Sequence, residues 1–254
     1  MKSKSFLPLN KVSKVIISAF LILLSWEIFA LIINDDFFMP GVLKTASALA
    51  EIIISDTFFK VVFTAFYRVL FGLILGVFSG IILAVACHKV SFIDGILSPV
   101  ISIMKATPVA CIIVLLWIRL NYTEIAIFVV VLMVLPIVWQ NVFDGLKSLD
   151  KNLIEVTQVF ELSKIQTLRV LIVPTALSYL LPAIITSVGL AWKAEIAAEI
   201  MTNSNIGKLI YDFKTVSYDT ASIFAWTVII VSLSIVYEKA AKYFLGRFLN
   251  AIKD

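Results

Sequence analysis

The sequence has few of the residues from which catalytic and metal sites are usually built. Its 254 residues include two cysteines and one histidine. Cys87 and Cys111 lie in apolar segments without ligand-like spacing, and the single His88 excludes the common histidine-rich metal sites. No phosphate-binding loop of the form G-x-x-x-x-G-K-[ST] occurs, so this chain is not expected to hydrolyse a nucleotide. We therefore expect a non-catalytic chain that binds no metal or cofactor of its own.

Charged residues are also scarce. They make up 15% of the sequence, whereas 61% of the residues are hydrophobic, and the mean hydropathy is +1.04. Ordinary water-soluble domains lack this balance, so most of the surface is expected to face lipid. The apolar runs follow one another without a soluble block, which predicts one transmembrane domain over residues 15–254 after a basic cytoplasmic leader, 1–14. The first apolar run is too long for a signal peptide.

Six apolar stretches are long enough to cross a hydrocarbon core of about 30 Å at about 1.5 Å per helical residue. The predicted spans are 15–33, 58–86, 96–118, 124–140, 174–201 and 221–237. Pro99 and Pro108 interrupt the third span, which suits the wall of a cavity. An amphipathic piece over 42–54 is expected to lie along the membrane surface. The sequence thus predicts an all-α integral membrane protein.

The second predicted span carries a series of small residues at four-residue intervals. Gly72, Gly76, Gly80 and Ala84 make one helix face nearly bare backbone, which lets another helix approach closely. Packing within one subunit is favoured over a self-association face. Arg68 on the same span is expected near an interface or paired with a counter-ion, because an unpaired charge at mid-membrane is unfavourable.

The distribution of basic residues predicts the orientation. Six spans place both termini on one side of the membrane. Of the 21 lysines and arginines, 13 lie on that side, 5 on the other and the rest within spans. The positive-inside rule then places both termini and the segment 150–174 in the cytoplasm.

Residues 150–174 form the longest charged stretch between spans. Polar residues alternate there with apolar ones in a pattern that suits two short amphipathic helices, with Ser163 as a cap for the second. A solvated loop that merely joins two spans is the alternative interpretation. If the cytoplasmic placement holds, this segment faces the compartment that contains ATP and soluble partners.

A few charged residues fall inside the predicted spans. Glu195 and Glu199 lie on one helix face and resemble an acid/base pair, but no metal or nucleophile accompanies them. We interpret them, with Lys193 and Lys105, as pathway or gate candidates, and we expect Lys193 to offset the two carboxylates. An intramembrane enzyme that uses Glu195 and Glu199 remains an alternative, as does an autonomous channel or secondary carrier.

The segment 150–174 also carries a motif. Glu155-Val156-Thr157, Glu161 six residues after Glu155, and Leu171-Ile172-Val173-Pro174 keep the spacing of the cytoplasmic EAA motif, in which Glu161 replaces a glycine. Further landmarks follow in order: Phe38-Met39-Pro40, Lys105-Ala106-Thr107-Pro108, Leu135-Pro136-Ile137-Val138, Gly145, Gly189-Leu190-Ala191-Trp192, Ala197-Ala198-Glu199 and Asn205-Ile206-Gly207. Over residues 37–248 the sequence resembles permease subunits of binding-protein-dependent ABC importers, in the branch that includes nitrate, taurine and aliphatic-sulfonate systems.

The resemblance implies the type I ABC importer permease fold and a set of partners. These are cytoplasmic ABC ATPase subunits, which bind ATP and Mg²⁺, an extracytoplasmic solute-binding protein, and a second permease subunit, either a copy of this chain or a different one. It implies that the coupling residues are Glu155, Val156, Thr157, Phe160, Glu161, Lys164 and Pro174. The solute is expected to be a small organic or inorganic anion or a vitamin-like compound. Glu161 leaves open how the motif's turn is built, because a non-glycine residue at positive φ is strained.

Overall fold

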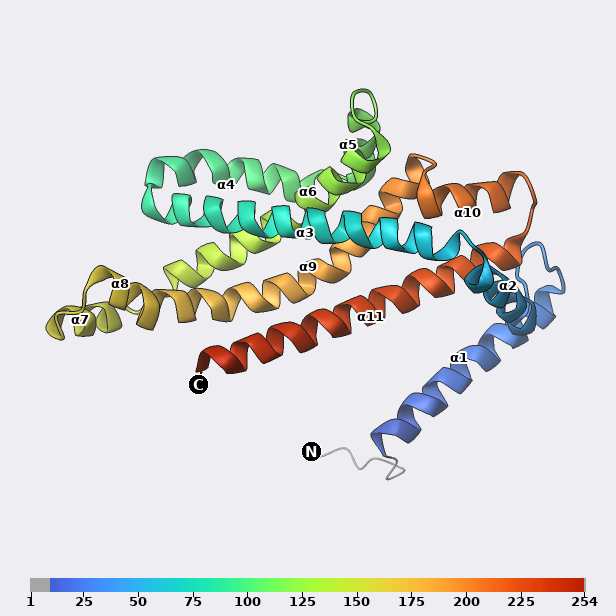
Figure 1. The fold of residues 1–254 in the computed structure, drawn as a ribbon, viewed down its shortest axis with the longest axis horizontal. Coiled ribbons are helices and arrows are strands. Elements are labelled where there is room, and N and C mark those ends of the chain that lie inside the picture. The colour runs from blue at the N-terminus through green and yellow to red at the C-terminus, as the bar shows by residue number, and fades with distance from the viewer. Residues whose placement is uncertain (1–9, 254) are drawn as a thin grey trace. The chain divides into compact units, whose positions relative to one another are not determined.

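The computed structural model describes residues 10–253, which form helices and connecting turns without a strand (Figure 1). Residues 1–9 of the predicted leader and residue 254 lie outside the described part. The elements are α1 (Lys11–Ile33), α2 (Val42–Ile54), α3 (Phe58–Lys89), α4 (Ser91–Ala106), α5 (Val109–Leu116), α6 (Tyr122–Lys147), α7 (Lys151–Val159), α8 (Lys164–Thr167), the π-helix η1 (Leu168–Ile172), α9 (Val173–Met201), α10 (Asn205–Thr215) and α11 (Thr220–Lys253).

Five of the described helical stretches are long and apolar enough to cross a bilayer, and the bent pair α4–α5 adds a sixth when it is counted as one span. The pair bends by 98° at Thr107 and Pro108. Thr107 is extended, with ψ 126°, because the ring of a following proline disfavours the helical conformation. Pro99, in contrast, lies inside α4 without ending it, so the expectation that both prolines interrupt this span was wrong for Pro99.

Local capping explains where several helices begin. The Asn121 side chain accepts a hydrogen bond from the Glu124 N–H, and the Glu124 carboxylate accepts one from the Asn121 N–H, which makes a capping box at the start of α6. α6 continues to Lys147, seven residues beyond its predicted end. Hydropathy falls after Gln140, but the backbone hydrogen bonds of the helix continue through its polar last turns.

The described chain divides into two compact units. Of the described residues, the first comprises 10–58 and 210–230. Within it, the Trp26 indole donates to the Pro40 carbonyl at 3.0 Å, and the Val42 N–H donates to the Glu27 carboxylate at 2.7 Å. Glu27 therefore lies at the N-terminus of α2, where an anion is favoured by the helix dipole. This contact explains a carboxylate within the first predicted span.

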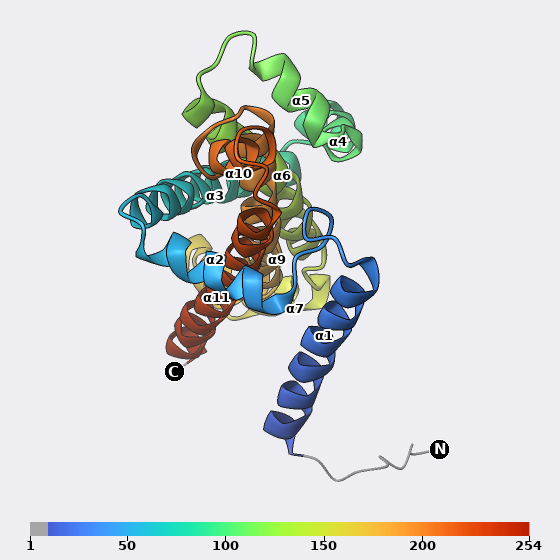
Figure 2. The same ribbon diagram turned by 90° about the vertical axis from the view of Figure 1, so that its right-hand side faces the viewer.

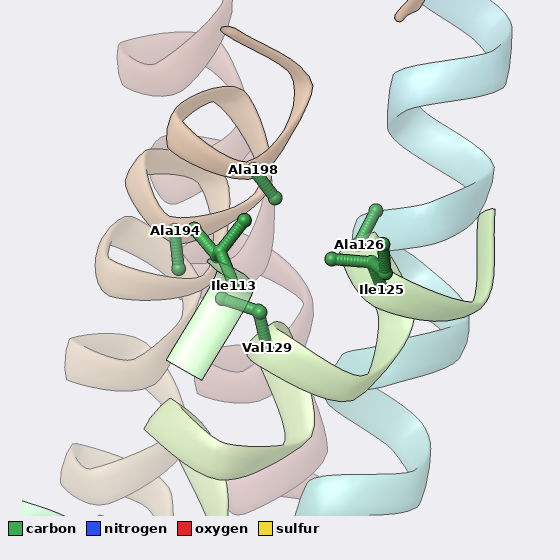
Figure 3. Close-up of a cluster of buried hydrophobic side chains, with 6 residues drawn as sticks. All are labelled: Ile113, Ile125, Ala126, Val129, Ala194 and Ala198. Carbon is green, nitrogen blue, oxygen red and sulfur yellow. The ribbon is translucent and has the colours of Figure 1, made fainter. Parts of the chain in front are cut away.

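The second unit comprises the described residues 59–209 and 231–253 and contains most of the residues considered below. α6 and α9 pack along each other in both views (Figures 1 and 2). A buried apolar cluster lies where α5 meets these two helices (Figure 3). It consists of Ile113, Ile125, Ala126, Val129, Ala194 and Ala198. Because the α9 members of this cluster are alanines, the larger side chains of α5 and α6 can pack close to the α9 backbone.

The predicted glycine face of α3 lies against α6. A Cβ atom added to Gly72 would lie 2.7 Å from Val130, one on Gly76 would lie 2.8 Å from Val134, and one on Gly80 would lie 2.9 Å from Val138. Each distance is too short for a real carbon contact. The glycines thus permit a close approach of two helices within one chain, where dispersion contacts hold them together in lipid.

Candidate functional site

The segment 150–174 folds as two short helices followed by a π-helical turn. The Asp150 carboxylate accepts a hydrogen bond from the Asn152 N–H at the start of α7. At the start of α8 the Ser163 hydroxyl accepts from the Gln166 N–H, and the Gln166 side chain accepts from the Ser163 N–H at 2.8 Å. The predictions of two short helices and of Ser163 as a cap are confirmed.

Glu161 makes the turn between α7 and α8. Its φ is 51°, in the left-handed region that favours glycine. The Glu161 N–H donates to the Gln158 carbonyl at 2.9 Å, and the Leu162 N–H donates to the Thr157 carbonyl at 3.0 Å. This pair of bonds is the Schellman arrangement that commonly ends a helix at a glycine. The turn therefore keeps left-handed geometry, at a strain of roughly 1–2 kcal/mol for a residue with a Cβ.

The surface of this segment exposes apolar side chains among charged ones. Val159 is 80% exposed and Phe160 73% exposed, and Val156 is also exposed. Among the motif residues, Glu155, Glu161, Lys164 and Pro174 are exposed as well, whereas Thr157 is buried and donates its hydroxyl to the Ile154 carbonyl. Aromatic residues are enriched at protein–protein interfaces, so Phe160 is a candidate contact residue in this polar segment.

The opposite end of α9 carries a buried ionic cluster. The Arg68 guanidinium of α3 donates to Glu199 Oε1 at 2.8 Å and to the Thr123 hydroxyl at 3.0 Å. Glu199 is fully buried and also accepts from the Asn205 side chain at 2.7 Å and from the Ile206 N–H at 3.0 Å. The expectation that Arg68 is paired is confirmed, and its partner lies 131 residues away in the sequence.

Gly207 lets α10 come close to the end of α9. A Cβ atom at this position would lie 2.2 Å from both the carbonyl carbon and the carbonyl oxygen of Glu199. Since these are backbone atoms, no side-chain rotation could make room. The Asn205-Ile206-Gly207 sequence therefore has a local explanation. Its first two residues donate to the Glu199 carboxylate, and the third permits the contact.

Lys193 does not offset the two carboxylates, which corrects the prediction. It is exposed, whereas Glu195 and Glu199 are fully buried. Residues two positions apart on a helix point in different directions, so Lys193 cannot share the face of Glu195. Gly189 lies about one helical turn before Lys193, on the same side of α9. A Cβ atom added to Gly189 would lie 4.0 Å from the Glu238 carboxylate, so this side of α9 faces α11.

The four predicted pathway residues thus separate into two groups. Glu195 Oε1 lies 4.0 Å from the Arg68 guanidinium, and with Glu199 it is enclosed by the packing of the second unit. In this conformation these two carboxylates line no open surface. Lys105 is exposed near the end of α4, and its amine donates to the Gln140 side chain of α6 at 3.0 Å. Among residues 10–253, no three or more histidine, cysteine or carboxylate side chains are grouped to hold a metal ion.

Similar sequences and solved structures identify the protein family to which this chain belongs. Residues 72–249 match the model of the family described as binding-protein-dependent transport system inner membrane component. The Bacillus subtilis (strain 168) protein named as the aliphatic sulfonates transport permease protein SsuC is 36% identical over 93 residues, which cover 36% of this chain and 33% of SsuC. The bicarbonate transport system permease protein CmpB of Synechococcus elongatus is 29% identical over 126 residues, covering 49% of this chain and 42% of CmpB. The matches thus span less than half the length of either relative.

Solved structures share the fold at lower sequence identity. A crystal structure of an amino acid ABC transporter with histidines aligns with a TM-score of 0.60 and 16% identity, over 75% of this chain and 91% of that one. An inward-facing structure of the MetNI methionine ABC transporter aligns with a TM-score of 0.55 and 16% identity, over 76% and 93%. The family match covers most of the chain, and its members are transport subunits rather than enzymes. The chain therefore belongs to the family of inner-membrane components of binding-protein-dependent ABC transport systems, and it is a multi-pass permease subunit.

Proposed function

We propose that this permease subunit forms part of the pathway for a small anion and is driven by a cytoplasmic ATPase that docks on residues 150–174. The observation that carries the docking proposal is the Phe160 ring. It is 73% exposed at the end of α7, directly before the left-handed turn at Glu161. Apolar residues of a short helix insert into a partner's groove, while charged neighbours such as Glu155 and Lys164 fix the orientation at the rim.

The anion proposal is supported by the named relatives. Sulfonates and bicarbonate, which appear in the names of SsuC and CmpB, are both small anions with several oxygen acceptors. A binding protein outside the cell delivers the solute, and a second permease subunit, proposed to be a copy of this chain, completes the pathway. ATP-driven closure of the ATPases then shifts the pathway between two states, which requires that the docking contacts differ in free energy between those states.

The docking proposal is tested with Phe160→Ala. Truncation of a buried aromatic at an interface commonly costs 2 kcal/mol or more, which is about a 30-fold loss of affinity. We therefore expect the Phe160→Ala permease to retain the ATPase poorly during purification in detergent. The matched control is Phe92→Ala, because Phe92 is 76% exposed but lies on α4, outside the segment.

The affinity of the purified permease for its partner ATPase, measured by titration, distinguishes the outcomes. Unchanged affinity in Phe160→Ala would contradict docking on this ring. Equal losses in Phe160→Ala and Phe92→Ala would show a general loss of fold rather than of the proposed contact.

A further inference from the structure

We propose that Lys105 and Gln140 form a contact site for the anionic solute on a water-facing surface within the membrane. The proposal rests on the anion importer proposed above and adds the residues that meet the solute. Its starting observation is a chain of three polar side chains between α4 and α6. The Lys105 amine donates to Gln140 Oε1 at 3.0 Å, and Gln140 Nε2 donates to the two Asp144 oxygens at 3.0 Å each.

The position of Lys105 along α4 places it at membrane depth. α4 begins at Ser91, directly after the basic end of α3 at His88 and Lys89. Fourteen residues separate Ser91 from Lys105, which is roughly 21 Å along a helix axis. The hydrocarbon core is about 30 Å thick, so the backbone at Lys105 lies well inside it if α4 starts near the membrane surface.

A lysine at this depth is unfavourable in contact with lipid. A central lysine costs about 2.5–3.5 kcal/mol on insertion scales, and charged residues in spans therefore face water-filled cavities or one another. Lys105 has a polar partner, Gln140 on the neighbouring helix α6, and its side chain remains exposed. This arrangement is typical of a surface that faces water.

The helix break beside Lys105 supports the same conclusion. Two residues after Lys105, the chain turns by 98° at Thr107 and Pro108. Such a break frees backbone groups that lipid cannot satisfy, so broken helices occur at membrane depth where they line a cavity or are buried in protein. In many transporters, discontinuous helices of this kind border the solute site.

The chemistry of the three side chains favours an anion. An ammonium has three N–H donors, and the contact with Gln140 uses one of them, which leaves donors for the oxygens of a sulfonate or bicarbonate. The Gln140 side chain separates the lysine from the negative charge of Asp144. Its carbonyl oxygen accepts from Lys105, whereas its amide nitrogen donates to the Asp144 carboxylate. The neighbouring cation, Lys147, lies 4.0 Å from the centre of the Phe143 ring. Lys105 is the cation that contacts this polar chain directly.

The test measures the charge selectivity of this surface in the assembled transporter with its ATPase. A thiol is introduced as Gln140→Cys in a background with Cys111→Ala, since Cys111 is exposed; Cys87 is buried and is retained. The thiol is then treated with an anionic probe, methanethiosulfonate ethylsulfonate, or a cationic one, methanethiosulfonate ethyltrimethylammonium. Rates are measured with and without ATP and vanadate, and the background protein without Gln140→Cys gives the blank.

We expect the Gln140→Cys thiol to react with the anionic probe in at least one of the two states. A charged cleft raises the local concentration of a counter-ion by tenfold or more. Replacing the lysine, as Lys105→Met, should therefore lower the rate with the anionic probe by about tenfold and raise the rate with the cationic probe. The control Lys60→Met removes an exposed lysine at the start of α3 and should leave both rates unchanged.

Two results would overturn the proposal. A thiol that reacts with neither probe in either state would show that lipid or a second subunit covers this face. A ratio of the two rates that Lys105→Met leaves unchanged would show that the lysine does not set the local potential. Uptake of ethanesulfonate and bicarbonate by cells with the unmodified transporter tests the anion importer separately. If the Gln140→Cys thiol prefers the anionic probe but cells take up neither anion, these two solutes are rejected, whereas the contact site is supported.

Discussion

The two ends of α9 are held in different ways. At its C-terminal end, Glu199 is fully buried and accepts hydrogen bonds from Arg68 on α3 and from Asn205 and Ile206 on α10. Its N-terminal end continues from η1 and α8, whose caps and turns join residues only a few positions apart. The hydrogen bonds at the C-terminal end thus join distant residues, whereas those directly before the N-terminal end are local, and the nearest long-range contact there is the packing of Tyr179 against Gly145 of α6.

This difference suits the proposed role, in which a docked ATPase moves the segment before the N-terminal end of α9. Local opening is easiest where few buried contacts and many exposed backbone hydrogen bonds occur, as in residues 150–172. π-helical turns such as η1 are frequently found at functional positions in helices. The buried ion pair at the other end resists displacement, because separating it leaves an uncompensated charge in a dry environment. The following predictions test this contrast.

The largest effect is expected from Glu199→Ala. It removes the carboxylate that accepts the hydrogen bond of the buried Arg68 and leaves only Glu195, at 4.0 Å; removal of one partner of a buried ion pair commonly costs about 3–5 kcal/mol. We expect a large fall in the thermal unfolding temperature of the purified complex, or loss of the complex. The control is Glu195→Gln, because Glu195 is 4.0 Å from the guanidinium and not bonded to it. If Glu195→Gln destabilises as much as Glu199→Ala, the ion pair is not the source of the anchoring.

A smaller loss is expected from Gly207→Ala. Its Cβ would overlap the backbone of Glu199 at 2.2 Å, so the start of α10 must shift. Such overpacking commonly costs about 1–3 kcal/mol. Gly95→Ala is the control, since nothing lies within 4 Å of a Cβ at that position and alanine favours the helix. Thermal unfolding of both variants is the measurement, and equal stability of the two would refute the close approach.

The smallest effect is expected at the opposite end of α9, from Glu161→Gly. A glycine relieves the strain at φ 51°, so the variant should stabilise the α7–α8 turn by about 1 kcal/mol. Hydrogen exchange of the α7 amides should slow accordingly. Glu155→Gly, inside α7, should instead speed this exchange, because glycine in a helix interior costs about 1 kcal/mol. Faster exchange in Glu161→Gly would contradict the assigned turn.

Much of the helical architecture was predictable because its signals are local. The apolar spans follow from hydropathy over about 20 residues, and the Ser163 cap follows from residues within three positions of it. The spacing of Glu155, Glu161 and Pro174, together with the ordered landmarks over residues 37–248, suggested the family. Hydropathy did not predict the end of α6, because this helix continues into polar residues beyond Gln140. It also did not show that Pro99 lies inside α4, whereas Pro108 lies at the bend.

The partners of the charged residues could not be predicted in the same way. The sequence indicated that Arg68 needs a counter-ion, but many carboxylates were available, and Lys193 was the nearest cation to Glu195 along the chain. The choice of Glu199 depends on which faces of α3, α9 and α10 meet, and that is decided by the packing of residues such as Gly72 and Gly207 against other helices.

The amino-acid sequence alone determined that the protein spans a membrane, where most of its helices lie and which family it resembles. These properties depend on transfer of residues from water to lipid and on hydrogen bonds between near neighbours. Only the tertiary structure decided which charges are buried as an ion pair and which remain exposed. That outcome depends on contacts between residues more than a hundred positions apart, for which the order of residues in one chain carries no direct signal.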